Sequence, residues 1–206
     1  TAMEMPQTIH DFGGFPKELF EVQYPAKGSP ELAQLTKELI LPTEVELNHD
    51  WGLDHGAWSV IKHLYPEANI PVIQMSIDYS LTGQAHFDMA QKLQSLRNKG
   101  ILIIGSGNIV HNLRMVDWAN FNKDNYGFDW AIEAREKINK NIIDGDFANL
   151  INYQKQGKAF ELAIPTPDHY LPLLYTLGLK NESENIQLFN DKLLAGSLSM
   201  TSVKIG

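Results

Sequence analysis

The 206-residue sequence contains no cysteine. This absence excludes disulfide bonds and thiolate metal sites, and it fits a cytoplasmic protein. Any transition metal must then be held by nitrogen and oxygen ligands, because no sulfur ligand of the thiolate type is available. The seven histidines are therefore the first residues to consider as ligands.

Other absences narrow the class of protein. No apolar run approaches the length of a membrane span, and the first residues do not show the order of a signal peptide. No basic cluster is longer than a pair, and 17 Lys and Arg stand against 25 Asp and Glu, a net charge of −8. Neither a nucleic-acid partner nor a membrane partner is therefore expected. The Walker loop, the Rossmann fingerprint and the Gly-x-Ser-x-Gly elbow are also missing.

What is present is an ordinary globular composition. Hydrophobic residues make up 43% of the chain and charged residues 20%, and a chain of this length suits one domain with a sizeable core. No repeat, low-complexity tract or linker interrupts it. We therefore expect residues 1–206 to form a single domain.

Short apolar runs alternate with amphipathic stretches along the chain. The strand–helix–strand order between residues 71 and 104 favours parallel pairing with a right-handed crossover. The predicted fold class is therefore α/β. Strands are predicted at 44–47, 71–78, 101–104 and 159–164, with an antiparallel edge pair at 185–189 and 196–205. Helices are predicted at 30–40, 58–65, 84–98, 128–142, 146–156 and 171–177.

Three loops carry more polar side chains than a connection needs, namely 49–55, 108–114 and 166–170. If each follows a strand of one sheet, all three converge on one rim, where open α/β sheets bind their ligands. Histidines that meet there would form a metal site or an acid–base site. No pair has the helical spacing of a zincin. The alternative for the 101–114 stretch is a Gly-rich turn whose histidine only bonds to backbone.

Five motifs in the same order are found together in one protein family. They are TIHDFGGFP (8–16), WGLDHG (51–56), GNIVHNLR (107–114), TPDHYLPLLY (166–175) and GSLSMTSV (196–203). The chain resembles the bacterial 4,5-DOPA dioxygenase-like proteins. These are class III extradiol ring-cleavage dioxygenases, related to the B subunit of protocatechuate 4,5-dioxygenase. The resemblance covers essentially the whole chain. It implies a three-layer α/β/α fold with a mostly parallel central sheet, and a mononuclear divalent metal. That metal is Fe(II) for ring cleavage, with Zn(II) often found in its place.

The resemblance also gives roles to four histidines by their motifs. His111 in GNIVHNLR and His169 in TPDHY are expected at the metal, and His55 in WGLDHG matches a histidine that lines the family's active site. His10 is expected to border the substrate pocket. The other histidines singled out are expected at the surface or in structural roles: His49, His63 and His86.

The chemistry of ring cleavage suggests which histidine binds the metal and which transfers protons. Ring cleavage needs a metal with open positions, a base for a catechol proton and an acid for a later step. His169, held between a proline and a helix, is the stiffer position and is expected to be a ligand. His111 lies on a Gly-containing loop, so it is favoured as the base, although it can also coordinate. His55 would assist as a second hydrogen-bonding histidine. The alternative for His55 is an imidazole bonded to Asp54 or to the Trp51 region.

The chain departs from the family at its front. Family members begin with a strand leading into His-Gly-Ser-Pro and a second strand ending in Ser-Ala-His-Trp, and each motif supplies a metal-binding histidine. Both are absent here. With two ligands left instead of the usual three, residues 1–206 alone are expected to bind metal weakly, to turn over no catechol, and to fold poorly or associate.

For the complete protein, the expected function is the opening of a catechol such as DOPA with O2. The expected partners are these small molecules alone, and the sequence indicates no oligomeric state. Two alternatives remain open. The first is a zinc-dependent hydrolase or metal-binding protein on the same scaffold. The second is an inactive fragment, if the N-terminal histidines are truly missing.

Overall fold

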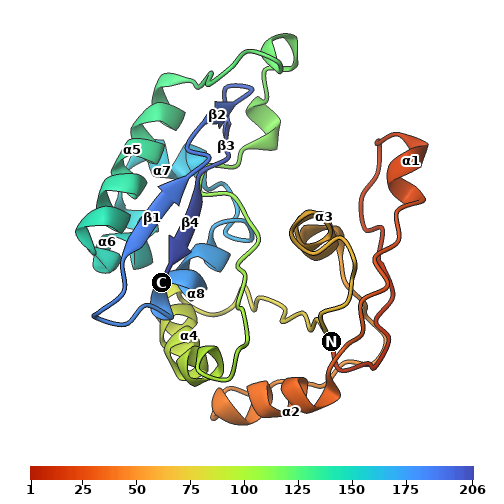
Figure 1. Cartoon of the computed structure of the whole chain (residues 1–206). Helices are drawn as coiled ribbons and strands as arrows, with labels where there is room; N and C mark the ends of the chain where they lie inside the picture. Colours follow the sequence, from red (N-terminus) through yellow and green to blue (C-terminus); the bar gives the residue numbers. More distant parts are fainter. The chain divides into compact units, whose positions relative to one another are not determined.

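The computed structural model describes all residues from Thr1 to Gly206, and they form two compact units, residues 1–76 and 77–206. Figure 1 follows the chain from the red N-terminus through yellow and green to the blue C-terminus. No helix in it is both long enough and apolar enough to span a bilayer.

The first unit consists of three helices joined by extended segments. These helices are α1 (Lys17–Phe20), α2 (Pro30–Leu39) and α3 (His55–Leu64). Helix α2 begins where the sequence predicts, because the Ser29 hydroxyl accepts a hydrogen bond from the Leu32 N–H at 3.2 Å. Helix α3 begins three residues earlier than predicted, at His55, and Asp54 is its N-cap. One buried hydrophobic cluster of this unit consists of Tyr24, Ala26, Leu53, Trp58 and Ile61.

The second unit is mostly helical. Its helices are α4 (Gly83–Arg97), η1 (Leu113–Met115), η2 (Trp118–Asn120), α5 (Asp129–Asp144), α6 (Phe147–Ile151), η3 (Tyr153–Lys155), α7 (Lys158–Ala163) and α8 (Leu171–Gly178). Helix α4 packs against α8, and α5 packs against α7. Helix α8 is apolar and largely buried, and Pro172 is tolerated because it lies in the first turn, as predicted.

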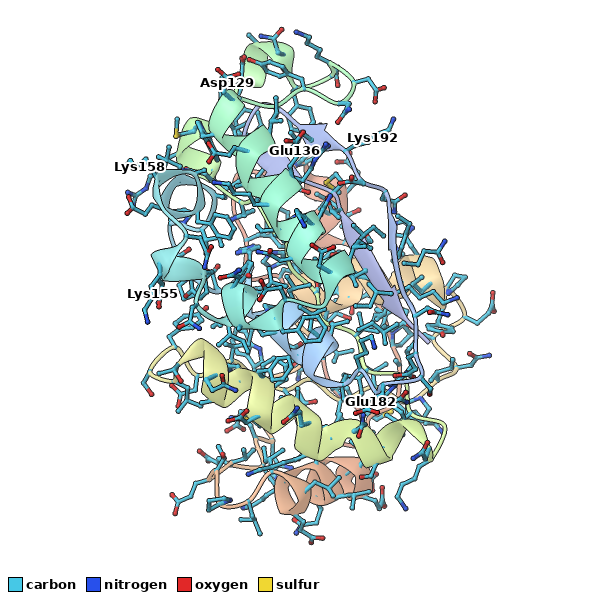
Figure 2. All side chains as sticks on the ribbon, turned by 90° about the vertical axis from the view of Figure 1, so that its left-hand side faces the viewer. Asp129, Glu136, Lys155, Lys158, Glu182 and Lys192 are labelled. Carbon is cyan, nitrogen blue, oxygen red and sulfur yellow. The ribbon has the colours of Figure 1, made fainter.

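The strands confirm the predicted antiparallel tail. Strand β1 (Ile186–Phe189) pairs antiparallel with β4 (Ser202–Ile205), and β2 (Leu193–Leu194) pairs antiparallel with β3 (Leu198–Ser199). Figure 1 shows β1 beside β4, with α5 along the same side. Charged side chains lie on the outer surface of this unit, as Figure 2 shows for Asp129, Glu136 and Lys158.

Four predicted strands are not strands in this structure. The segments 44–47, 71–78 and 101–104 contain no residue paired in a strand, and the run 159–164 lies mostly in α7. The two named sheets are antiparallel, so they do not confirm a mostly parallel sheet. In α7 the buried residues Ala159, Phe160 and Ala163 share one helical face. A short apolar run with that spacing fits a helix as well as a strand.

His86 is a further correction, because its side chain is completely buried instead of lying at the surface. Its Nε2 donates to the Asp78 carbonyl oxygen at 3.1 Å, and its Nδ1 lies 3.0 Å from the Tyr175 hydroxyl. Both ring nitrogens are therefore satisfied, which is the condition for burying a polar ring. Burial lowers the pKa of His86, although the bond and charge of Asp78 act in the opposite direction.

Candidate active site

The second unit brings His111 and His169 into direct contact. Their rings are stacked, with centroids 3.6 Å apart and planes 10° apart. The two residues are 58 positions apart in sequence, and they come from the second and third of the polar loops identified above. Two of the predicted site residues are therefore neighbours.

Glycine allows this approach. A Cβ atom at Gly107 would lie 2.2 Å from the His169 carbonyl oxygen, and one at Gly105 would lie 2.5 Å from the Pro172 carbonyl oxygen. Next to Gly107, the Asn108 N–H donates to the His169 carbonyl oxygen at 2.9 Å. The glycines are thus required because one backbone lies directly on another.

His111 is held by hydrogen bonds on both sides. Its own N–H donates to the Ala163 carbonyl oxygen at 2.8 Å, and it forms an antiparallel bridge with Leu198. The next N–H, of Asn112, donates to the Ser197 carbonyl oxygen at 3.1 Å, and the buried Ser197 hydroxyl donates back to the Asn112 carbonyl oxygen at 2.9 Å. Hydrogen bonds from the GSLSMTSV motif therefore fix the backbone around His111. Sequence reasoning missed this role.

His169 has a carboxylate partner that was also missed. Its Nδ1 lies 2.5 Å from Asp168 Oδ2, so Nδ1 carries a proton and Nε2 keeps its lone pair when the ring is neutral. Burial alone would raise the pKa of Asp168, but hydrogen bonds from Thr166 and His169 and the charge of His169 lower it overall. A carboxylate that orients a histidine in this way is typical of the surroundings of metal ligands.

The His111 ring is kept neutral by its surroundings. Burial and the adjacent His169 lower its pKa to about 4, against the opposing charge of Asp168. Neutral imidazole is the form of histidine that coordinates a metal.

The donor set of the pair fits part of a metal site. Two imidazoles, one of them oriented by a carboxylate, suit Fe(II) or Zn(II). No group of three or more His, Asp or Glu side chains is arranged to hold an ion. Because catalytic sites usually take three protein ligands, the pair fits two of those positions.

In the first unit, the His55 partner is Asp11, so the proposed contacts with Asp54 or the Trp51 region are wrong. Asp11 Oδ1 lies 3.0 Å from the His55 backbone nitrogen and 2.9 Å from His55 Nδ1. Asp54 instead caps α3, accepting from the Ala57 N–H at 3.0 Å.

His10 lies in the same unit, and its Nε2 donates to the Val22 carbonyl oxygen at 2.9 Å. The rings of His10 and His55 both pack on Phe12, at centroid distances of 5.9 and 5.6 Å. Further aromatic neighbours of Phe12 are Phe15, Phe20 and Trp58. His49 and His63 are exposed, as predicted.

Comparison with known proteins agrees with these motifs. Residues 2–200 match the family described as the catalytic LigB subunit of aromatic ring-opening dioxygenase. The chain is 47% identical to the Escherichia coli K12 protein named 4,5-DOPA dioxygenase extradiol, over 100% of this chain and 76% of that protein. It is 33% identical to the Beta vulgaris protein of the same name, over 98% of this chain and 75% of that protein.

A solved structure is also similar. A crystal structure of an uncharacterized protein from Escherichia coli K12 superposes with a TM-score of 0.82 at 40% sequence identity. The match covers 98% of this chain and 81% of that chain. The fold is therefore an α/β dioxygenase fold. The chain belongs to the family of the catalytic LigB subunit of aromatic ring-opening dioxygenases, and it is a ring-cleaving dioxygenase of the extradiol type.

Proposed function

We propose that this protein opens the ring of a catechol such as DOPA beside its two hydroxyls, using O2 and a mononuclear divalent metal. The observation that carries the proposal is the stacked pair His111 and His169, which joins two family motifs in space. The names of the Escherichia coli and Beta vulgaris relatives support DOPA as the substrate.

In this proposal His111 and His169 are metal ligands, and Fe(II) is the catalytic metal, with Zn(II) as the ion found in its place. The bound metal would supply Lewis acidity and would bind the catechol and O2. Asp168 orients His169 through Nδ1. The Gly-containing loop of His111 favours this residue as the base, because such a loop is expected to be less rigid. Its backbone is instead held on both sides, which supports the ligand role for it as well.

Proton transfer then falls mainly to His55, with His111 as the second candidate. The His55 side chain is 49% exposed and is bonded through Nδ1, so its Nε2 is available to a substrate hydroxyl. His10 is assigned to the border of the substrate pocket, and its packing on Phe12 supports a place among aromatic groups.

We further propose that residues 1–206 act as one catalytic domain with a three-layer α/β/α fold and a mostly parallel sheet. The segment 101–104 supports this, since it is apolar and extended and none of its residues is paired in a strand.

The test is direct. The complete protein is loaded with Fe(II) without oxygen and then mixed with L-DOPA, caffeate or unsubstituted catechol in aerated buffer. A yellow semialdehyde should form while O2 is consumed. Absence of product from every catechol would refute the proposal. Zinc-dependent turnover of an ester or amide without O2 uptake would favour the hydrolase instead.

A further inference from the structure

Asp11 and His55 make a two-point contact in the first unit. One carboxylate oxygen, Asp11 Oδ1, accepts from both the backbone N–H and the Nδ1–H of His55, at 3.0 and 2.9 Å. The side chains are 27% and 49% exposed, respectively, so the imidazole still reaches solvent. The contact fixes both the position of the residue and the orientation of its ring.

This contact also fixes the tautomer of the His55 ring. An ionised carboxylate can only accept hydrogen bonds, so Nδ1 must carry the hydrogen and Nε2 is left with the lone pair. Burial alone would raise the pKa of Asp11, but the hydrogen bonds and charge of His55 outweigh it, and the pKa lies below its ordinary value. The Asp11 carboxylate is therefore ionised at neutral pH.

The backbone around the pair is held in place. Thr8 and Leu53 form a parallel bridge, and the Ile9 N–H donates to the Leu53 carbonyl oxygen at 2.8 Å. The indole N–H of the buried Trp58 donates to the Ile9 carbonyl oxygen at 2.9 Å. The edge of Phe12 also packs on the His55 ring, at 5.6 Å and 77°. Geometry held in this way costs little entropy when a substrate binds.

The ring of His10 is bonded differently from that of His55. Its Nε2 donates to the Val22 carbonyl oxygen, so the nitrogen with the lone pair is Nδ1. A carbonyl oxygen carries no full negative charge, so it stabilises a protonated ring less than a carboxylate does. Of the two histidines that pack on Phe12, only His55 has a carboxylate on its ring.

We propose that Asp11 is a positioning residue that holds His55 in the Nδ1–H tautomer, so that His55 Nε2 takes a proton from a catechol hydroxyl. This inference rests on the proposed function. The hydroxyl proton moves to Nε2, and the oxygen keeps the electron pair. The Nδ1 proton stays on Nδ1 throughout, and the Asp11 carboxylate remains ionised beside the imidazolium. The proton on Nε2 then returns to an oxygen atom of the substrate or product.

The tautomer can be measured without substrate or metal, by two-bond ¹H–¹⁵N correlation spectra of the full ¹⁵N-labelled chain. The His55→Gln variant identifies the signals of the His55 ring. In the wild-type protein, the neutral ring should show a protonated Nδ1 and an unprotonated Nε2. A wild-type ring protonated mainly at Nε2 would overturn the proposal, even if no variant folded.

Three variants test the cause. Asp11→Asn offers an amide that can donate to the ring, so the population should shift toward the Nε2–H tautomer. Asp11→Glu keeps a carboxylate and should restore the wild-type pattern at least in part. Asp50→Asn removes the same charge from an exposed position in the loop before α3 and should change nothing.

Turnover of L-DOPA by the iron-loaded complete protein tests the consequence. Asp11→Asn should lower kcat by a factor on the order of 10 to 10², with KM within about twofold of wild type. Its metal content should be unchanged, because neither proposed ligand is altered. An unchanged kcat would overturn the positioning role and leave the proposed function standing. A wild-type protein with the expected tautomer but no turnover would refute the proposed function, and the Asp11–His55 pairing would stand.

Discussion

Replacement of Gly107 by alanine should separate the two stacked histidines. The new Cβ would lie 2.2 Å from the His169 carbonyl oxygen, whereas ordinary contact begins near 3.4 Å, so one backbone must move by roughly 1 Å. Overpacking of this kind costs about 1–3 kcal/mol. The adjacent hydrogen bond from the Asn108 N–H to that same oxygen would be lost as well, for about 1 kcal/mol more. We expect the free energy of unfolding to fall by about 2–4 kcal/mol.

The measurement is urea unfolding of wild type and variant, together with zinc titration followed by calorimetry. Gly13→Ala is the matched control, because a Cβ at that position meets nothing within 4 Å. The control should change stability by less than about 0.5 kcal/mol. Gly107→Ala should also bind zinc more weakly, because the two rings no longer lie together. If Gly107→Ala unfolds at the same urea concentration as Gly13→Ala and binds zinc like wild type, the close approach does not hold the pair.

Three further outcomes are expected. His169→Ala and His111→Ala should both lose metal, as measured by elemental analysis; full retention by either would remove that residue from the ligand set. Ser197→Ala should lower the free energy of unfolding by about 1–2 kcal/mol, because the buried Asn112 carbonyl oxygen loses its hydroxyl donor. Ser202→Ala is the control, because its hydroxyl makes an exposed contact, and it should lower the free energy of unfolding by less than half as much. His86 makes the stability of the fold depend on pH, because burial lowers its pKa in the folded protein. Its contribution to the free energy of unfolding is complete above about pH 6.5. That contribution declines as the pH falls below this value, because the unfolded chain then takes up the proton. Urea midpoints between pH 7.5 and pH 5 should therefore fall less steeply in His86→Gln than in wild type, and equal slopes would contradict this account.

Helix ends and the antiparallel tail could be predicted because their signals are local. The Ser29 cap and Pro30 mark the start of α2 within a few residues. The alternation of apolar and polar residues along 185–189 and 196–205 predicts an antiparallel pair, and β1 and β4 form one. Such patterns need no knowledge of what the segment contacts.

Whether the segment 101–104 forms a strand is harder to predict, because a strand is defined by the segment with which it pairs. Its apolar, β-branched residues give an extended backbone, but Leu102 is 63% exposed and no strand pairs with it here. The sequence therefore predicts the extended conformation of this segment correctly, whereas its predicted pairing is not confirmed. Hydrogen bonding between strands depends on residues that are distant in sequence, and no local pattern contains that information.

The burial of His86 was predictable from geometry but not from residue type. Position 86 lies four residues before Ala90 and seven before Leu93, so it falls on the buried face of α4. Its polarity suggested the surface instead. The partner that makes burial possible, Tyr175, comes from α8 and is 89 residues away.

The sequence predicts that the loops of His111 and His169 converge, and their rings are indeed stacked, but it does not predict the acids and glycines around the histidines. These acids and glycines are arranged in the same way in both units. In the second unit Gly107 allows one motif to lie on another, and the second motif carries Asp168 beside His169. In the first unit a Cβ at Gly52 would lie 2.0 Å from the Gln7 carbonyl oxygen, and the neighbouring segment carries Asp11 beside His55.

In each unit, a glycine permits a close backbone approach and a carboxylate fixes the tautomer of one histidine. Most residues of the family motifs thus position the histidines and are not themselves reactive. Their glycine, serine and aspartate positions should therefore tolerate substitution less well than the exposed histidines His49 and His63, although those two have the side chain better known for catalysis.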